Sequence, residues 1–212
     1  MEQEITISAG GADLLGDLVV PETARAFVVF AHGSGSSRLS ARNRMVAETL
    51  RETGRYGTLL FDLLMPEEDA NYLNRFDIRL LADRLAGATR SALEIPSVAG
   101  MPVGYFGAST GAAAAIVAAA RLPDTVRAVV SRGGRPDLAG VELSTIAVPV
   151  LLIVGSLDTE VLQLNWHAFD LMTTTEKKVE VVPGATHLFG EPGTLEQAAA
   201  HALHWFDRFL AE

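Results

Sequence analysis

The chain of 212 residues has no cysteine, which excludes a disulfide framework, a thiolate nucleophile and a thiolate metal site. Basic residues are also scarce: 17 Lys and Arg stand against 26 Asp and Glu, giving a net charge of -9 at pH 7. The charges are spread along the sequence without runs. This balance argues against nucleic acid or an anionic membrane as a partner.

No apolar run approaches the length of a bilayer span, because glycine, proline or charge interrupts the longest stretches. The first residues, MEQEI, lack the basic start and apolar segment of a secretory signal. We therefore expect a soluble, cytoplasmic protein. Nucleotide-binding patterns are missing as well: residues 33–38, GSGSSR, lack the third glycine of a dinucleotide fingerprint, and no G-x-x-x-x-G-K-[ST] occurs.

Strand-like and helix-like segments alternate along most of the chain. Two lead-in strands, 4–9 and 13–20, are joined by Gly10 and Gly11, which predicts an antiparallel hairpin. Further strands are predicted at 26–31, 57–63, 102–108, 126–131, 148–154 and 178–182, and helices at 41–53, 77–93, 110–121, 160–173 and 194–211. The alternation predicts one α/β domain over 1–212, with a mostly parallel sheet and helices on both faces.

The most informative motif is G-A-S-T-G at 107–111, which fits G-x-S-x-G and lies between a strand and an alanine-rich helix. A serine on such a sharp turn has its hydroxyl exposed, so Ser109 is the predicted nucleophile. Gly107 and Gly111 remove β-carbons that would clash around the turn. Thr110, the next residue, would offer its backbone N–H to an oxyanion.

An acid and a base follow the serine in the order that this architecture requires. Asp158 comes after the buried strand 148–154, and His187 comes after the strand 178–182. His187 would take the proton of Ser109, and Asp158 would hold the imidazole in the productive tautomer. Singly, Ser109 could be a turn serine and Asp158 a helix N-cap; their conjunction favours a serine hydrolase.

The loop after the strand 26–31 reads H-G-S-G-S-S and is expected to supply the second oxyanion donor. The Ser34 N–H is our first choice and that of Gly35 the alternative. His32 precedes the nucleophile and is expected to brace this loop. Three other histidines fall on polar helix faces and are expected to be solvated, namely His167, His201 and His204.

The connection from 131 to 147, where many hydrolases insert a lid, is short, so we expect an open pocket without a large lid and small ester substrates. Arg132 and Arg135 lie in this connection, on the side where strand ends carry the site. Either arginine could bind a substrate carboxylate. The alternative, which we favour, is that they pair with Asp137 or face solvent.

The chain resembles the dienelactone hydrolase-like group of α/β-hydrolases, through AHGSGS at 31–36, YFGASTGA at 105–112, LIVGSLD at 152–158 and PGATHLF at 183–189. The resemblance implies that fold, a Ser109, Asp158 and His187 triad, and hydrolysis of carboxylic esters or lactones without a cofactor. Dienelactone hydrolases proper use a cysteine nucleophile, whereas this chain has serine at that position and no cysteine. The dienelactone substrate is therefore not expected for this chain. Lactonase, thioesterase and peptidase activities, or a non-catalytic binding protein of this fold, stay open. The oligomeric state is not indicated.

Overall fold

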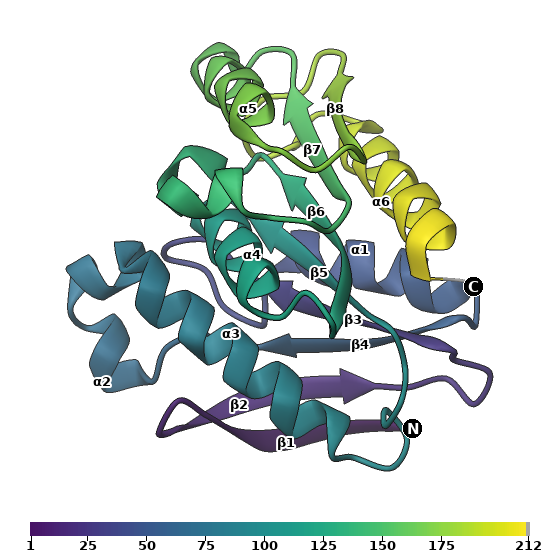
Figure 1. Ribbon diagram of the computed structural model, residues 1–212. Helices are drawn as coiled ribbons and strands as arrows, with labels where there is room; N and C mark the ends of the chain where they lie inside the picture. Colours follow the sequence, from purple (N-terminus) through teal and green to yellow (C-terminus); the bar gives the residue numbers. More distant parts are fainter. Residues whose placement is uncertain (211–212) are drawn as a thin grey trace.

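The computed structural model describes residues 1–210, which build an eight-stranded sheet in the order β1-β2-β4-β3-β5-β6-β7-β8 (Figure 1). The strands are β1 (Glu2–Ala9), β2 (Ala12–Val19), β3 (Ala26–Ala31), β4 (Tyr56–Phe61), β5 (Val103–Ala108), β6 (Val126–Arg132), β7 (Val150–Gly155) and β8 (Lys177–Val182). β1 pairs antiparallel with β2, and β2 with β4, whereas β3 to β8 run parallel. The predicted antiparallel lead-in is confirmed; Gly10 and Gly11 turn it with positive φ angles of 55° and 81°.

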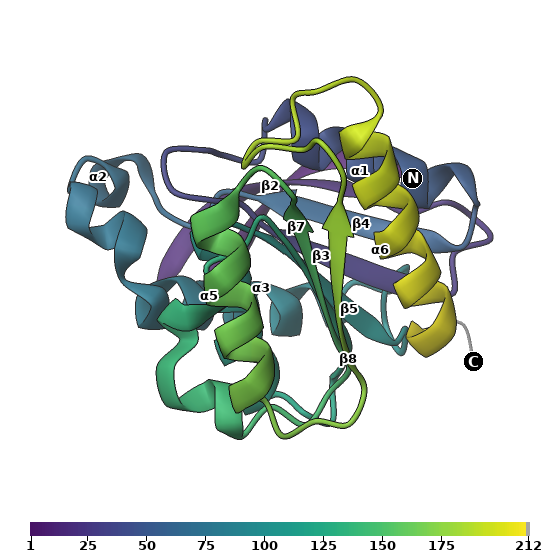
Figure 2. The ribbon, with the colours of Figure 1, turned by 90° about the horizontal axis from the view of Figure 1, so that it is seen from above.

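Helices cover both faces of the sheet, as Figure 2 shows from above. They are α1 (Ala41–Glu52), α2 (Pro66–Asp69), α3 (Ile78–Leu93), α4 (Thr110–Arg121), α5 (Thr159–Leu171) and α6 (Thr194–Leu210), with 3₁₀ segments η1 (Tyr72–Phe76) and η2 (Pro136–Ser144). α1 and α6 pack one apolar cluster, which includes Leu50 and Phe206. α3, α4 and α5 pack the other, which includes Leu81 and Ile116. The predicted α/β class with helices on both faces is therefore confirmed.

The predicted long elements agree with the observed ones to within two residues at each described end. Residue 211, the predicted end of the last helix, lies outside the described residues. The sequence did not indicate α2, η1 or η2. Each is short, and the two proline-initiated segments, at Pro66 and Pro136, carry no sustained hydrophobic period by which a helix is recognised.

The order of the strands determines where the sheet has a crevice that can bind a ligand. β3 lies between β4 and β5, so the chain leaves β3 toward one side of the sheet and later returns to the other. The loops that follow β3 and β5 therefore flank a crevice at the carboxyl edge of the sheet, where ligands bind in open α/β sheets. Among residues 1–210, no helix combines the length and the hydrophobicity of a membrane span.

Candidate active site

Ser109 stands alone between the end of β5 and the start of α4, with φ 50° and ψ −122°. This left-handed conformation is unfavourable for a residue with a side chain and persists only where the surroundings impose it. Two backbone hydrogen bonds do so: the Ser109 N–H donates to the carbonyl of Arg132 (3.4 Å), and the Arg135 N–H donates to the carbonyl of Ser109 (3.1 Å). The sharp strand-to-helix turn predicted from the motif is thus present.

The two glycines of the motif lie where no β-carbon fits. A β-carbon on Gly111 would stand 2.2 Å from the carbonyl oxygen of Ala31, and one on Gly107 would stand 2.4 Å from Cα of Ala112. The prediction that glycine is required on both sides of Ser109 is confirmed. Because Gly111 contacts the end of β3, the same glycine also brings the start of α4 against the loop that follows β3.

His187 and Asp158 meet across two loops. Nδ1 of His187 lies 2.7 Å from Oδ2 of Asp158, and the Asp158 carboxylate is largely shielded, with 14% of its side chain exposed. Asp158 occupies the N-cap position of α5, yet its side chain makes no capping hydrogen bond. The sequence left Asp158 as either a helix N-cap or a partner of His187, and in the structure its carboxylate is bound to the imidazole. A carboxylate in this position orients the imidazole as a general base.

The loops after β7 and β8 hold each other in place. The Ser156 N–H donates to the Val182 carbonyl (3.0 Å), and the Leu157 N–H donates to the Ala185 carbonyl (3.0 Å). Further along, the Glu191 carboxylate accepts from both the N–H and the hydroxyl of Thr186, and these hydrogen bonds lower the pKa of Glu191. His187 therefore sits on a loop that is braced on both sides.

Ser109 and His187 line one pocket of about 220 Å³. Within residues 1–210 they form no direct hydrogen bond, but Nδ1 of His187 is engaged by Asp158, which leaves Nε2 as the nitrogen for proton transfer. Hydrogen bonds between catalytic groups are often long in the absence of substrate and tighten when it binds. The structure thus places two of the predicted triad residues, Ser109 and His187, at one pocket, and the third, Asp158, is bound to His187.

The predicted oxyanion donors are neighbours as well. Ser34 lines the pocket, and its N–H donates to Oγ1 of Thr110 at 2.9 Å. Thr110 is the first residue of α4, so its own N–H has no acceptor within the helix. Gly35, the alternative donor, has a positive φ of 68° and stands outside the residues that line this pocket. Ser34 is the better placed of the two, although its N–H has a protein partner here.

His32 has the bracing role expected of it. Its Nε2 accepts from the Leu63 N–H (3.0 Å), so its Nδ1 carries the proton and donates to the Gly33 carbonyl (3.0 Å). Burial lowers the pKa of the His32 imidazole, which favours this neutral form. Both ring nitrogens are therefore used to tie the loop after β3 to the end of β4.

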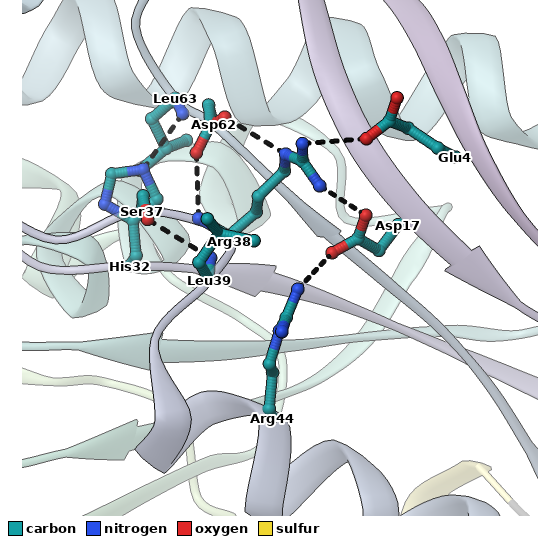
Figure 3. Close-up of polar contacts among 9 residues, drawn as sticks. All are labelled: Glu4, Asp17, His32, Ser37, Arg38, Leu39, Arg44, Asp62 and Leu63. Carbon is teal, nitrogen blue, oxygen red and sulfur yellow. Dashed lines mark hydrogen bonds and ion pairs between the residues drawn. The ribbon is translucent and has the colours of Figure 1, made fainter.

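Arg38 fastens the same loop to the N-terminal hairpin, as Figure 3 shows. Its backbone N–H donates to Asp62 (2.8 Å), and its guanidinium pairs with Asp62, Asp17 and Glu4. The sequence did not indicate Arg38, because its partners Asp17, Asp62 and Glu4 lie 21, 24 and 34 positions away from it and form no recognisable motif. Only the order of the strands brings them together.

The two candidate substrate-binding arginines differ. Arg135 pairs with Asp137 through two hydrogen bonds (2.9 and 2.8 Å), which is the arrangement that the sequence analysis favoured over binding of a substrate carboxylate. Arg132 is buried, lines the pocket with Ser109, and makes no ion pair with any residue in the described range. His167 and His204 are exposed as expected, while His201 is partly buried near Glu180.

Comparison with known proteins agrees with this geometry. The profile of the dienelactone hydrolase family matches residues 60–210, more than half of the chain. The chain belongs to the dienelactone hydrolase family. A solved relative in that group, a dienelactone hydrolase from Anabaena variabilis, is 50% identical, with a TM-score of 0.94 over 99% of this chain and 98% of the other.

More distant structures share the fold alone. Est1E from Butyrivibrio proteoclasticus is 16% identical, with a TM-score of 0.82 over 99% of each chain. A Xanthomonas campestris protein, described as an α/β serine hydrolase without lid, is 20% identical, with a TM-score of 0.80 over 100% of this chain and 96% of the other. The α/β-hydrolase fold without a large lid is therefore confirmed for this member of the family.

Two curated relatives from Mycobacterium tuberculosis strains are 57% identical over 205 residues, and both carry the name "Putative phosphoribosyl transferase". The match covers 97% of this chain but 46% of each relative. The chain thus spans about half the length of the curated relatives it matches, and their name describes the longer proteins.

Proposed function

We propose that this member of the dienelactone hydrolase family is a serine esterase that cleaves small carboxylic esters through Ser109, His187 and Asp158. The observation that carries the proposal is the 2.7 Å contact between His187 and Asp158, at a pocket that also contains the strained Ser109. Asp158 stands at a helix N-cap but its side chain caps nothing, and instead binds a histidine that shares a pocket with the half-buried Ser109. This arrangement has a catalytic explanation and no evident structural one.

The chemistry follows from the proton positions. Asp158 keeps the proton of His187 on Nδ1, so Nε2 is free to accept the Ser109 proton as Oγ attacks the ester carbonyl. His187 then returns that proton to the leaving alcohol, which leaves an acyl-enzyme. Water, deprotonated by the same nitrogen, cleaves the acyl-enzyme to the free acid and restores Ser109.

The negative charge on the attacked carbonyl oxygen needs donors, each worth about 3 kcal/mol on precedent. The Thr110 N–H and the Ser34 N–H are assigned this role. The Ser34 N–H is bonded to the Thr110 hydroxyl in the free protein. When the oxyanion forms, the Ser34 N–H is shared between it and Oγ1 of Thr110.

Substrate size is inferred from the cover over the site. The connection between β6 and β7 contains only η2, with no inserted helical lid, and the pocket holds about 220 Å³. Short or flexible esters fit such a space. We expect the rate to fall steeply as the acyl chain lengthens, and faster turnover of long-chain lipids would contradict this inference.

The test is hydrolysis of p-nitrophenyl acetate and butyrate by the wild type and by Ser109→Ala, with Ser144→Ala as the matched control. Ser144 is an exposed serine on η2, away from the pocket. We expect activity and fluorophosphonate labelling in the wild type and the control, and neither in Ser109→Ala. A folded wild-type protein that is inert to short esters and stays unlabelled would support a non-catalytic binding protein.

Lactones and thioesters are natural additions to the same panel, since both are attacked at an acyl carbon by the same triad. The transferase name of the Mycobacterium tuberculosis relatives belongs to chains of which this one matches 46%. The serine motif lies in the shared part, so we propose ester hydrolysis for that part. Release of diphosphate from phosphoribosyl diphosphate by this chain would overturn that assignment.

A further inference from the structure

The pocket beside Ser109 is positively charged in a protein that is negative overall. The chain carries a net charge of -9, yet the residues that line this pocket include Arg42 and Arg132 and, among those described, no aspartate or glutamate. Acidic residues outnumber basic ones elsewhere, so their absence here is a local feature. Field lines from charges in a cleft are focused by its low-dielectric walls, which attracts an ion of opposite sign.

Arg132 is the stronger of the two observations. It is 5% exposed, and its Nε has no hydrogen-bond partner among residues 1–210. Its guanidinium lies over the ring of Phe189, 5.5 Å from the ring centre. Burial, and secondarily the charge of Arg42, lowers the pKa of Arg132 to about 10, which still leaves it charged at neutral pH. A buried cation without a counter-ion is costly, so this position calls for an anion from outside the chain.

The first turn of α1 faces the same pocket. Ser40 caps this helix, and Ser40, Arg42 and Asn43 all line the pocket. The turn contains no acidic residue that would neutralise its positive dipole end. The N–H of Arg42, in the second position of the helix, has no intrahelical acceptor. Ser36 also lines the pocket, so hydroxyl donors stand beside the two guanidinium groups.

We propose that the ester cleaved at Ser109 carries a phosphate group, held between Arg132, Arg42 and the start of α1. This inference rests on the proposed function for the identity of the bond cleaved, though the anion site stands on its own geometry. A phosphate dianion neutralises two guanidinium groups, whereas one carboxylate leaves a positive charge unmatched. Its several oxygens can also accept hydrogen bonds from the guanidinium, hydroxyl and helix N–H donors that line the pocket.

The reaction itself is unchanged by the phosphate. Ser109 attacks the acyl carbon, the bond from that carbon to the alcohol oxygen breaks, and water later releases the acid. The phosphate ester stays intact and serves as a handle. Because nucleophile and arginines share about 220 Å³, the phosphate lies only a short spacer from the ester.

Three acetate esters that share the 2-acetoxyethoxy group test the proposal: 2-acetoxyethyl phosphate, (2-acetoxyethoxy)acetate and the neutral 2-methoxyethyl acetate. We expect kcat/KM for the phosphate ester to exceed that of the neutral ester by roughly 10-fold or more, since hydrogen bonds between charged groups supply differences of this size. Arg42→Gln and Arg132→Gln should each lower this ratio by roughly 10-fold. Arg127→Gln, which removes an exposed arginine from the same strand as Arg132, should leave the ratio unchanged.

A second measurement is independent of catalysis. Inorganic phosphate should raise the melting temperature of the wild type and of Arg127→Gln more than that of Arg42→Gln. Arg42 is only partly buried, so this variant remains informative where Arg132→Gln fails to fold.

A phosphate-to-neutral ratio near one, a ratio insensitive to Arg42→Gln, or a preference for the carboxylate ester overturns the proposal. Hydrolysis of the neutral ester without such a preference retains the esterase and rejects the phosphate site. If phosphate stabilises the protein through Arg42 but none of the three esters is hydrolysed, the phosphate site is retained and the esterase is rejected.

Discussion

Replacement of Gly111 by alanine tests how tightly Ser109 is coupled to the loop that follows β3. The new β-carbon would stand 2.2 Å from the Ala31 carbonyl oxygen and 2.5 Å from that of His32, whereas real β-carbons stay at least 3.0 Å away. Both obstructing atoms are backbone, so α4 and the end of β3 must separate by about 0.8 Å, the difference between 3.0 and 2.2 Å. Overpacking of this kind costs about 1–3 kcal/mol, offset by roughly 1 kcal/mol because alanine favours a helix over glycine.

We therefore expect Gly111→Ala to lose about 0–2 kcal/mol of unfolding free energy in urea. A displacement near 1 Å at a reacting centre costs about 100-fold in rate, so fluorophosphonate labelling of Ser109 should slow by about that factor. The matched control is Gly190→Ala, at a glycine with nothing within 4 Å of the added carbon and no positive φ. If Gly111→Ala and Gly190→Ala are equally stable and label equally fast, the close approach does not organise the site.

Two further predictions concern groups of the site. Asp158→Asn should keep the fold but lower kcat for p-nitrophenyl acetate by about 10³ to 10⁴, because the amide no longer fixes the His187 tautomer; a loss under 10-fold would remove Asp158 from the mechanism. His32 has a lowered pKa in the folded protein, so the unfolded chain binds its proton first as the pH falls below about 6.5. Unfolding free energy should thus decrease below that pH, by at most about 1.4 kcal/mol per pH unit for this group. His32→Gln should lack this component in urea titrations from pH 7 to 5, and an unchanged slope would show that His32 is not its source.

The long helices and strands were predictable because each has a recognisable pattern within its own residues. Continuous apolar runs such as 150–155 have the signature of a buried parallel strand, and the alanine run of α4 has that of a helix lying against a sheet. The Ser109 turn was predictable for the same reason: strand, glycine-flanked serine and helix are contiguous. Features formed by about ten contiguous residues could therefore be predicted from the sequence.

Contacts between distant segments were not predictable in detail. The order Ser, Asp, His indicated that Asp158 and His187 belong together, but no spacing revealed that Ser34 donates to the Thr110 side chain. The contrast between Arg132 and Arg135 was also hidden. Arg132 ends β6 and Arg135 follows three residues later, yet Arg132 lines the pocket whereas the guanidinium of Arg135 pairs with Asp137.

The Arg38 cluster ties the opening hairpin to the loop that follows β3, which lines the pocket beside Ser109. Glu4 and Asp17 lie in β1 and β2, at one border of the sheet, and the guanidinium of Arg38 joins both to the loop that follows β3 (Figure 3). Chimeras that exchange this hairpin between homologous enzymes should therefore transfer the two carboxylates and Arg38 as one block. A graft that omits them would uncouple the rim of the sheet from its reactive centre.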